Sequence, residues 1–348
     1  MTTQTPNAAN PLGMRGLAFA ELSGDERAVA ALLHGMGFSR TRRHPRKAID
    51  VYTQGDATFI VNVEPGSFAS QFRGQHGPCA SALGILVADA RFAFQEAVRR
   101  GAEPFTGASA TSLDAPAILG IGGSLVYFVD GASPRGQQVD REMPLLAKPD
   151  MVPEVGFTAF DHLTNNVPKG DLERWAKFYK DIFGFTEVRS FDIQGQKTGL
   201  YSYALRSPDG SFCIPINEDK GEKGQIAEYL REYKGAGIQH IALVTQDLLG
   251  ALDKMKGAVA TLDIDDDYYA EVFTRVPGVV EDPARIKRHQ VLVDGDEQGY
   301  LLQIFTKNCL GPIFFELIQR HNHLSFGEGN FGALFRSIER DQERRGVI

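Results

Sequence analysis

The chain has 348 residues, which suits two domains of ordinary size better than one. Its formal net charge is -7 and it carries no basic stripe, so we exclude nucleic acid as a partner. The apolar runs are only strand-sized, which excludes a membrane-spanning helix, and three scattered cysteines favour a reducing, cytoplasmic location without disulfides.

The N-terminal half begins with a polar stretch and continues as two strand-helix units. Residues 1–12 lack the basic and apolar segments of a secretory signal, so we expect a flexible N-terminus there. The strand-like "GLAFAEL" at 16–22 leads into "ERAVAALLHGMGF" at 26–38, where apolar residues recur at helical spacing. A second strand, turn and helix follow from Ser81, and we expect this domain to span 13–145.

The C-terminal half repeats this pattern after a proline-rich linker predicted at 146–156. The segment "ERWAKFYKDIFGF" at 173–185 has the length of segment 26–38 and the same Glu-Arg and Gly-Phe ends. Residues 239–257 repeat the unit that begins at Ser81. The sequence therefore predicts four strand-helix-strands units, two in each half.

Two histidines and one glutamate interrupt apolar, strand-like segments of the second half. They are His162 in "FDHLTNN", His240 in "GIQHIALVT" and Glu316 in "PIFFELIQR". When the halves are aligned, Ala82 stands opposite His240, so the first half repeats the scaffold with apolar residues at these strand positions. This asymmetry favours a structural first half and a functional second half.

A buried carboxylate in an apolar run is unfavourable unless it is paired or bound to a cation. Glu316 therefore reaches water at a strand edge, pairs with a residue such as Arg320, or binds a metal ion. With His162 and His240 it forms a candidate facial triad, which leaves about three of six octahedral positions open and suits non-haem Fe(II) oxygen chemistry. By ligand type alone, Mn(II) and Zn(II) fit the same three residues.

Several other strands carry one polar residue among apolar ones. Ser202, Asn217 and Gln303 are examples, and their repetition predicts a curved sheet with a wetted pocket. The alternative for each of them is a satisfied hydrogen bond in the core. The remaining histidines are expected at the surface, in contact with solvent: His34, His44, His76, His289, His321 and His323.

The last segment, 326–346, has apolar residues at helical spacing behind a glycine-rich start. These residues are Phe331, Leu334, Phe335 and Ile338. The pattern predicts a terminal helix that is docked by its apolar stripe. The alternative is a lid with glycine hinges, which turns its two aromatic rings toward a pocket.

Several segments, taken as a set, resemble the 4-hydroxyphenylpyruvate dioxygenase family: "FDHLTNN", "LYSYALRS", "PINED", "GIQHIALVT", "LLQIFTK", "PIFFELIQR" and "GEGNFGALFRSIE". The resemblance implies an α+β fold of four βαβββ modules, paired into two open β-barrel-like domains of the vicinal-oxygen-chelate (glyoxalase-like) type, with a C-terminal helix. Residues 13–145 then form a non-catalytic domain. Residues 157–348 form a catalytic Fe(II) domain with a C-terminal lid helix.

The resemblance also implies roles for individual residues. It makes Fe(II) the cofactor, with His162, His240 and Glu316 as its ligands. Phe331 and Phe335 are expected to sandwich the aromatic ring of the substrate. The residues at positions that the family associates with the substrate pocket or catalysis are Ser202, Asn217, Gln225, Gln239, Gln303, Phe305, Phe314, Asn330, Phe331 and Phe335.

The activity that the resemblance implies is Fe(II)-dependent oxidation of 4-hydroxyphenylpyruvate with O2 to homogentisate and CO2, in tyrosine and phenylalanine catabolism. It comprises oxidative decarboxylation, ring hydroxylation and side-chain migration. The substrate carries its own 2-oxo acid, so no 2-oxoglutarate is needed. The family further implies a homo-oligomer, either a dimer or a tetramer.

Three alternatives stay open on the same scaffold. 4-Hydroxymandelate synthase resembles a sister enzyme that oxidises the benzylic carbon of the same substrate and leaves the ring alone. An extradiol dioxygenase has a similar architecture and triad but cleaves the ring of catechols. A metal-free ligand-sequestering module would use the scaffold for binding only.

Overall fold

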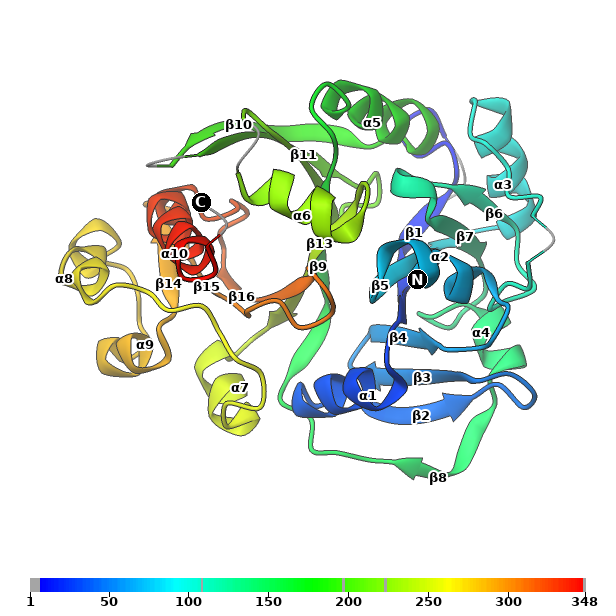
Figure 1. Cartoon of the computed structure of the whole chain (residues 1–348), viewed down its shortest axis with the longest axis horizontal. Coiled ribbons are helices and arrows are strands. Elements are labelled where there is room, and N and C mark those ends of the chain that lie inside the picture. Colours follow the sequence, from blue (N-terminus) through cyan, green and yellow to red (C-terminus); the bar gives the residue numbers. More distant parts are fainter. Residues whose placement is uncertain (1–6, 108, 196–197, 222–223, 347–348) are drawn as a thin grey trace.

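The structure is a computed structural model that describes residues 7–107, 109–195, 198–221 and 224–346 (Figure 1). Each half of the chain forms one eight-stranded sheet. In Figure 1 the first half lies at the right, in blue to cyan, and the second half lies mainly at the left, in green to red. Most of the helices lie around the outside of the sheets, whereas the C-terminal helix lies over the open inner side of the second sheet.

The first half contains, in chain order, β1 (Met14–Ser23), α1 (Glu26–Gly35), β2 (Ser39–Arg43), β3 (Ile49–Gln54), β4 (Ala57–Asn62), α2 (Phe68–His76), β5 (Cys79–Val87), α3 (Ala90–Arg99), β6 (Ala117–Leu119), η1 (Ile121–Gly123), β7 (Leu125–Val129), α4 (Gln137–Glu142) and β8 (Leu145–Asp150). The second half contains β9 (Phe157–Asn166), α5 (Leu172–Phe178), η2 (Tyr179–Phe183), β10 (Thr186–Gln194), β11 (Gly199–Arg206), β12 (Cys213–Asp219), α6 (Gln225–Tyr233), β13 (Gly237–Thr245), α7 (Leu248–Met255), α8 (Asp266–Arg275), α9 (Pro283–His289), β14 (Leu292–Gly295), β15 (Tyr300–Phe305), β16 (Phe314–His321), η3 (Glu328–Asn330) and α10 (Phe331–Arg344).

The two sheets share the order of their central strands but differ at their edges. Among the described residues, two strands, β6 and β7, follow the helix of the second module, where the other modules have three, and β8 pairs with β2 at the edge of the first sheet. The strand order is β6-β7-β5-β1-β4-β3-β2-β8 in the first sheet and β10-β11-β12-β9-β13-β16-β15-β14 in the second. In every module the strand before the helix pairs in parallel with the last strand, as β1 does with β4 and β13 does with β16. The modules of a half join where their first strands pair antiparallel, β1 with β5 and β9 with β13. The predicted α+β fold of four repeated modules in two open, barrel-like sheets is confirmed.

The helices that follow the first strands begin at aspartates. The side chain of Asp25 accepts a hydrogen bond from the backbone N–H of Ala28 at the start of α1. Asp89 and Asp247 cap α3 and α7 in the same way. A carboxylate at this position satisfies a backbone donor that the helix leaves free and stabilises the helix by about 1 kcal/mol. The repeated aspartate of the sequence therefore marks the same turn in three modules.

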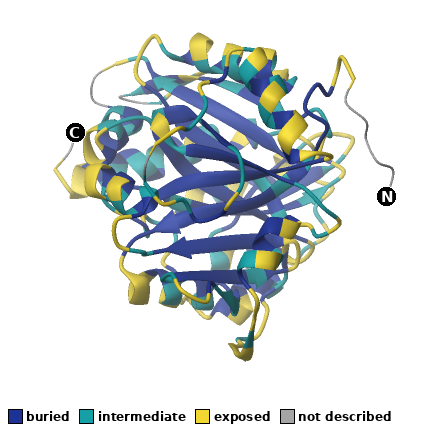
Figure 2. Cartoon of the chain, turned by 90° about the vertical axis from the view of Figure 1, so that its right-hand side faces the viewer, coloured by how far each residue is buried: buried dark blue, intermediate teal, exposed yellow. Residues whose placement is uncertain are grey.

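One hydrophobic core joins the two halves. It extends from the helices of the first half to the outer face of the second sheet, and Figure 2 shows the strands buried while the exposed residues lie mainly on helices and loops. Phe59 on β4 lies at this junction, with its ring centroid 5.2 Å from that of Phe160 and 5.9 Å from that of Phe315. Phe38 stacks on Phe157 in the same region. The outer face of the second sheet is therefore packed against the first half.

The inner face of the first sheet is filled by its own side chains. Phe19 and Tyr127 face each other there, with ring centroids 6.0 Å apart, in a separate apolar cluster. Gly84 stands directly opposite Phe19 in the ladder, and a Cβ at this glycine would overlap the Phe19 ring. The absence of a side chain at Gly84 therefore leaves room for the Phe19 ring in the interior of the first barrel.

The structure departs from the sequence predictions at several points. Residues 1–6 of the expected flexible N-terminus lie outside the described residues, whereas Asn10 and Leu12 are buried, so packing begins before residue 13. The expected linker 146–156 begins inside β8, which pairs with β2.

The described helices include none that is long and apolar enough to cross a membrane.

Three histidines expected in solvent, His44, His76 and His323, are buried, which corrects the prediction for each of them. His323 is 8% exposed. His44 is 7% exposed, and its Nδ1 atom accepts hydrogen bonds from the backbone N–H groups of Arg46 and Lys47. His76 is also 7% exposed, and its Nδ1 atom lies 2.7 Å from the carbonyl oxygen of Tyr233 in the other half. The position of His44 and His76 in loops did not reveal that their imidazoles form hydrogen bonds with backbone groups.

Glu21 is a buried carboxyl in the first barrel, with 1% of its surface exposed. Its Oε1 atom accepts from the Ser81 hydroxyl and the Asn62 amide, while Oε2 has no hydrogen-bond partner among the described residues. Burial raises the pKa of Glu21, although the hydrogen bonds from Ser81 and Asn62 act in the opposite direction. The folded chain therefore holds the proton of Glu21 to a higher pH than the unfolded chain does.

We expect Glu21→Gln to stabilise the protein as the pH rises. The contribution of Glu21 to stability is full below the unfolded pKa of about 4.5 and is lost as the pH rises through the higher folded value. An amide in its place carries no such loss. The melting temperature of Glu21→Gln minus that of the parent should therefore increase between pH 4 and pH 8. The increase should be about 2–4 °C for each kcal/mol of unfolding free energy that the parent loses when Glu21 ionises. A surface control, Glu103→Gln, should show a flat difference, and a flat difference for Glu21→Gln would contradict the prediction.

Candidate metal centre and substrate cavity

The inner face of the second sheet carries His162, His240 and Glu316 on three neighbouring strands, β9, β13 and β16. The Nε2 atoms of His162 and His240 lie 3.0 Å and 3.4 Å from Oε2 of Glu316. The same two Nε2 atoms are 3.3 Å apart. All three residues are buried, with 3%, 8% and 3% of their surface exposed. The structure thus brings the predicted triad together, with one ligand atom from each residue within 4.8 Å of the others.

Each of these histidines follows a residue that the ladder between β9 and β13 skips. The skipped residues are Asp161, just before His162, and Gln239, just before His240. A β-bulge of this kind re-aims the side chain of the extra residue and bends the strand. Regular alternation would point each bulge residue away from the histidine beside it. The bulges instead bring both side chains next to the imidazoles.

The two bulge residues bind the Nδ1 atoms of the histidines. Oδ1 of Asp161 lies 2.7 Å from Nδ1 of His162, and Oε1 of Gln239 lies 3.0 Å from Nδ1 of His240. Carboxylate and amide oxygens only accept hydrogen bonds, so the imidazole Nδ1–H donates in both pairs. The Nε2 atom of each ring is left facing Glu316, where it is available to a metal ion.

The electrostatics of the triad favour a cation. Burial lowers the pKa of His162, but Glu316 on one side and Asp161 on the other outweigh it and raise this pKa to about 9. Burial, with the nearby His162, holds the pKa of His240 below its usual value. Burial would raise the pKa of Glu316, but the two histidines outweigh it and lower this pKa to about 2. Positive charge is therefore held beside an ionised Glu316, and a metal ion bound at Nε2 would take the place of the proton there.

The donor set fits a divalent metal ion. Two imidazole nitrogens and one carboxylate oxygen converge from one sheet face, and the cavity lies in front of them. This is the ligand set of non-haem Fe(II) oxygenases. The sequence offered Arg320 as an alternative partner for Glu316, but its guanidinium donates to Asp161 instead. The strand-edge alternative also fails, because β16 is an inner strand and Glu316 is buried.

A hollow of about 640 Å³ opens in front of the triad. Most of the residues predicted for the substrate pocket line it, together with the three candidate ligands. The predicted residues that line it are Ser202, Asn217, Gln225, Gln239, Phe305, Phe314, Phe331 and Phe335. Their contact with a substrate stays a prediction.

Two predicted site residues lie outside this lining. Gln303 is 1% exposed, and neither polar atom of its side chain has a hydrogen-bond partner among the described residues. It lies under Gly327, whose backbone approaches so closely that a Cβ would overlap the amide. Asn330 is fully buried, and its Oδ1 accepts from the hydroxyl of Tyr268 and from Arg275. Asn330 therefore fastens the start of α10, whereas Gln303 keeps an unused amide next to the site.

Sequence reasoning missed three residues at the centre. Phe326 packs edge-on against His162, with ring centroids 5.6 Å apart, and Phe191 contacts both Phe326 and Phe331. Phe191 alternates with Ile193 on β10, which is a weak strand signal because most of β10 is exposed. Asp161 gave no signal, because alternation on a regular strand assigns it to the face opposite His162. Its position follows only from the bulge.

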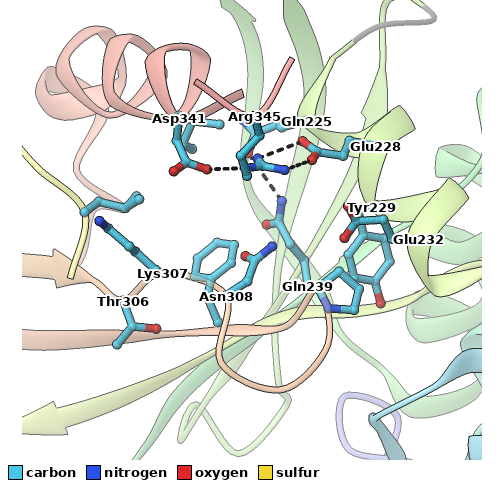
Figure 3. A pocket seen from close by; sticks show the side chains of 14 residues that line it. Gln225, Glu228, Tyr229, Glu232, Gln239, Thr306, Lys307, Asn308, Asp341 and Arg345 are labelled. Carbon is cyan, nitrogen blue, oxygen red and sulfur yellow. Dashed lines mark hydrogen bonds and ion pairs between the residues drawn. The ribbon is translucent and has the colours of Figure 1, made fainter. Parts of the chain in front are cut away.

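Helix α10 closes one side of the cavity with Phe331, Leu334, Phe335 and Ile338. Its far end is docked on α6 at a second hollow of about 550 Å³, which Figure 3 shows from close by. This hollow shares Gln225, Gln239, Phe314 and Ile338 with the cavity in front of the triad, so these four side chains separate the two.

A buried carboxylate holds this end of α10. Glu228 on α6 is 7% exposed; it forms an ion pair with Arg345 and accepts a hydrogen bond of 2.7 Å from Gln342. Arg345 also pairs with Asp341 on its own helix, and Figure 3 shows both interactions as dashed lines. The last turn of α10 is therefore tied to α6 through charge.

We expect Arg345→Ala to loosen α10. The change removes the cationic partner of a buried carboxylate, which is costly to leave underpaired. Backbone hydrogen exchange in residues 331–344 should become faster, while exchange in β9, β13 and β16 stays as in the parent. Arg344→Ala is the matched control, because its partner Asp263 is half exposed and such pairs contribute little. Unchanged exchange in Arg345→Ala would show that the ion pair does not hold the helix.

We expect His162→Ala to lose metal binding, because it removes one of the three ligand atoms that converge at this site in the described part of the chain. Affinity for Fe(II) under anaerobic conditions should fall by more than about 100-fold, beyond the range for residues that only orient a ligand. The control is His289→Ala, since His289 contacts Asp253 away from the triad. Titration calorimetry and metal content after gel filtration give the result, and metal retained by His162→Ala would contradict the assignment.

Comparison with known proteins places this geometry in a family. Residues 8–140 match the family described as "Hydroxyphenylpyruvate dioxygenase, HPPD, N-terminal", and residues 159–287 match the "Glyoxalase/Bleomycin resistance protein/Dioxygenase superfamily". Protein MelA of Shewanella colwelliana is 54% identical over 97% of this chain and 99% of its own length. The 4-hydroxyphenylpyruvate dioxygenase of Legionella pneumophila subsp. pneumophila (strain Philadelphia 1) is 44% identical over 97% of this chain and 98% of its own.

A solved structure extends the comparison to the fold. It is a mutant of 4-hydroxymandelate synthase from Streptomyces coelicolor, which superposes with a TM-score of 0.80 at 26% identity and covers 94% of this chain and 99% of its own. The fold is thus shared with that enzyme, while the much higher sequence identity is to the dioxygenase from Legionella. The chain belongs to the 4-hydroxyphenylpyruvate dioxygenase family.

Proposed function

We propose that the chain catalyses the Fe(II)-dependent oxidation of 4-hydroxyphenylpyruvate with O2 to homogentisate and CO2, a step of tyrosine and phenylalanine catabolism. The observation that carries this proposal is the convergence of His162, His240 and Glu316 at a cavity with an aromatic wall. A relative that bears the name of this activity matches the chain over nearly its whole length. The metal-free alternative leaves the buried, closely spaced triad without a purpose.

The assignment of Fe(II) rests on the ligand set. Imidazole and carboxylate from one side suit Fe(II) and leave positions open toward the cavity. When bound, Fe(II) supplies the electrons that activate O2 and a positive charge that attracts the 2-oxo acid. The chain itself holds the two imidazoles in one orientation, through the Nδ1–H bonds to Asp161 and Gln239.

The rest of the cavity is suited to hold the aromatic end of the substrate. We place the ring between Phe331 and Phe335 on α10 and the apolar wall opposite them. Ser202 and Asn217 are directly paired across β11 and β12, so they form one polar spot on this wall. We place the phenol oxygen or ring-bound intermediates there. Gln303, to which we assign the same role, has an unpaired amide among the described residues but lies under Gly327 rather than in the cavity wall.

Helix α10 has a further role in this proposal. As a lid that closes the cavity with its apolar face, it keeps bulk water from the reacting groups and opens for substrate and product. The three cysteines are free, which suits the cytoplasmic location that we propose. We also propose that the enzyme works as a homo-oligomer, a dimer or a tetramer.

The test is oxygen consumption with product identification. Protein loaded anaerobically with Fe(II) should consume O2 with 4-hydroxyphenylpyruvate, release one CO2 for each O2, and form homogentisate. His162→Ala should lower kcat by more than about 100-fold, and His289→Ala should retain the parent rate. Consumption of a catechol in place of the 2-oxo acid would overturn the proposal in favour of a ring-cleaving enzyme.

The rival 4-hydroxymandelate synthase activity needs a separate readout. Homogentisate and 4-hydroxymandelate are isomers, and both reactions use one O2 and release one CO2, so neither gas exchange nor product mass distinguishes them. Proton NMR does, because ring hydroxylation removes one ring hydrogen whereas benzylic oxidation leaves all of them. A product that keeps every ring hydrogen would assign the chain to the synthase reaction.

A further inference from the structure

Asp161 and Arg320 form a closed ion pair directly behind the metal-ligand candidate His162. Nε and Nη2 of Arg320 each donate to one carboxylate oxygen of Asp161, and both distances are 2.8 Å. Oδ1 of Asp161 accepts in addition from Nδ1 of His162 at 2.7 Å. Only 14% of the Asp161 side chain and 15% of the Arg320 side chain are exposed. The pair is thus shielded, bidentate and in contact with the imidazole.

We infer that Asp161 and Arg320 are positioning residues for the metal centre, which fix the ring of His162 and, through Arg320, the segment that covers it. The inference rests on the proposed function only in taking His162 as a ligand. The bulge in β9 brings Asp161 next to the imidazole, and its carboxylate accepts the Nδ1–H bond that leaves Nε2 for the metal.

Arg320 makes this carboxylate tolerable. Asp161 and Glu316 lie on opposite sides of one imidazole, so the centre contains one buried carboxylate, Glu316, and one that is largely shielded, Asp161. A second uncompensated negative charge at this depth is unfavourable. The guanidinium of Arg320 neutralises Asp161 and fixes its plane through two parallel hydrogen bonds, which a lysine cannot make.

The remaining nitrogen of Arg320 binds the chain that follows β16. Nη1 donates to the carbonyl oxygens of His323 and Ser325, at 3.0 Å and 2.6 Å. The next residue is Phe326, whose ring packs against His162 on the cavity side. One guanidinium therefore holds the imidazole from behind, through Asp161, and holds in place the aromatic ring in front of it.

The other histidine is held differently. His240 donates to the neutral amide of Gln239, which also lies 3.4 Å from Gln225 at the cavity wall. In the first sheet, the residue that the ladder skips at the position of Asp161 is Ala18, next to Phe19. Among these three bulge positions, a charged side chain therefore stands only at Asp161, beside the ligand candidate His162.

The experiment measures metal affinity without turnover. Co(II), which replaces Fe(II) without reacting with O2, is titrated into metal-free protein while its visible absorption is followed. Asp161→Ala should weaken binding by about 10- to 100-fold and change the absorption bands, and Asp161→Asn, which keeps an acceptor oxygen, should weaken it less. Arg320→Lys should weaken binding and also speed hydrogen exchange in residues 321–327.

The matched control is Asp50→Ala, which removes a buried carboxylate from Arg40 and Arg43 in the first half. It should lower the melting temperature as Asp161→Ala does, yet leave Co(II) affinity and absorption unchanged. If Asp161→Ala and Asp161→Asn both bind Co(II) like the parent, the inference is overturned. Absence of binding in the parent itself would instead overturn the metal site, and a different oxidation product would affect only the proposed reaction.

Discussion

The buried carboxylate of Glu316 sets the conditions for the rest of the second half. Burying an ionised group at this depth carries a desolvation penalty on the order of several kcal/mol unless opposite charge or hydrogen bonds compensate it. Two imidazoles at 3.0 Å and 3.4 Å provide that compensation, and a metal ion provides it better. Everything around the triad keeps this arrangement in place, from the bulges behind the histidines to the aromatic rings in front of them.

The two halves show how a repeated scaffold gains or loses a site. The first sheet has bulges at the same places in its central ladder as the second. By register, Phe19, Ala82 and Tyr127 take the places of His162, His240 and Glu316. The backbone geometry for a metal centre is therefore present twice, and side chains alone decide that one copy is filled and the other is open.

The internal repeats, and the polar residues that interrupt apolar strands, allowed much of this structure to be predicted from the sequence. The Glu-Arg and Gly-Phe segments identified the modules, and the aligned aspartates correctly placed Ala82 opposite His240. The triad followed from three polar residues in apolar strands. What alternation cannot predict is a bulge, since one extra residue reverses the face of its neighbours. Asp161 was missed for this reason, and His76 because its partner Tyr233 is distant in sequence.

The contact of Phe59 with Phe160 and Phe315 links the two halves directly beneath the triad. Phe160 lies two residues before His162, and Phe315 immediately precedes Glu316. The first half thus supports, by packing, the strands that carry His162 and Glu316. A truncated protein that begins at β9 would expose this aromatic face to solvent. Removal of the first half would therefore take away the packing behind the triad and lower the solubility of the second half.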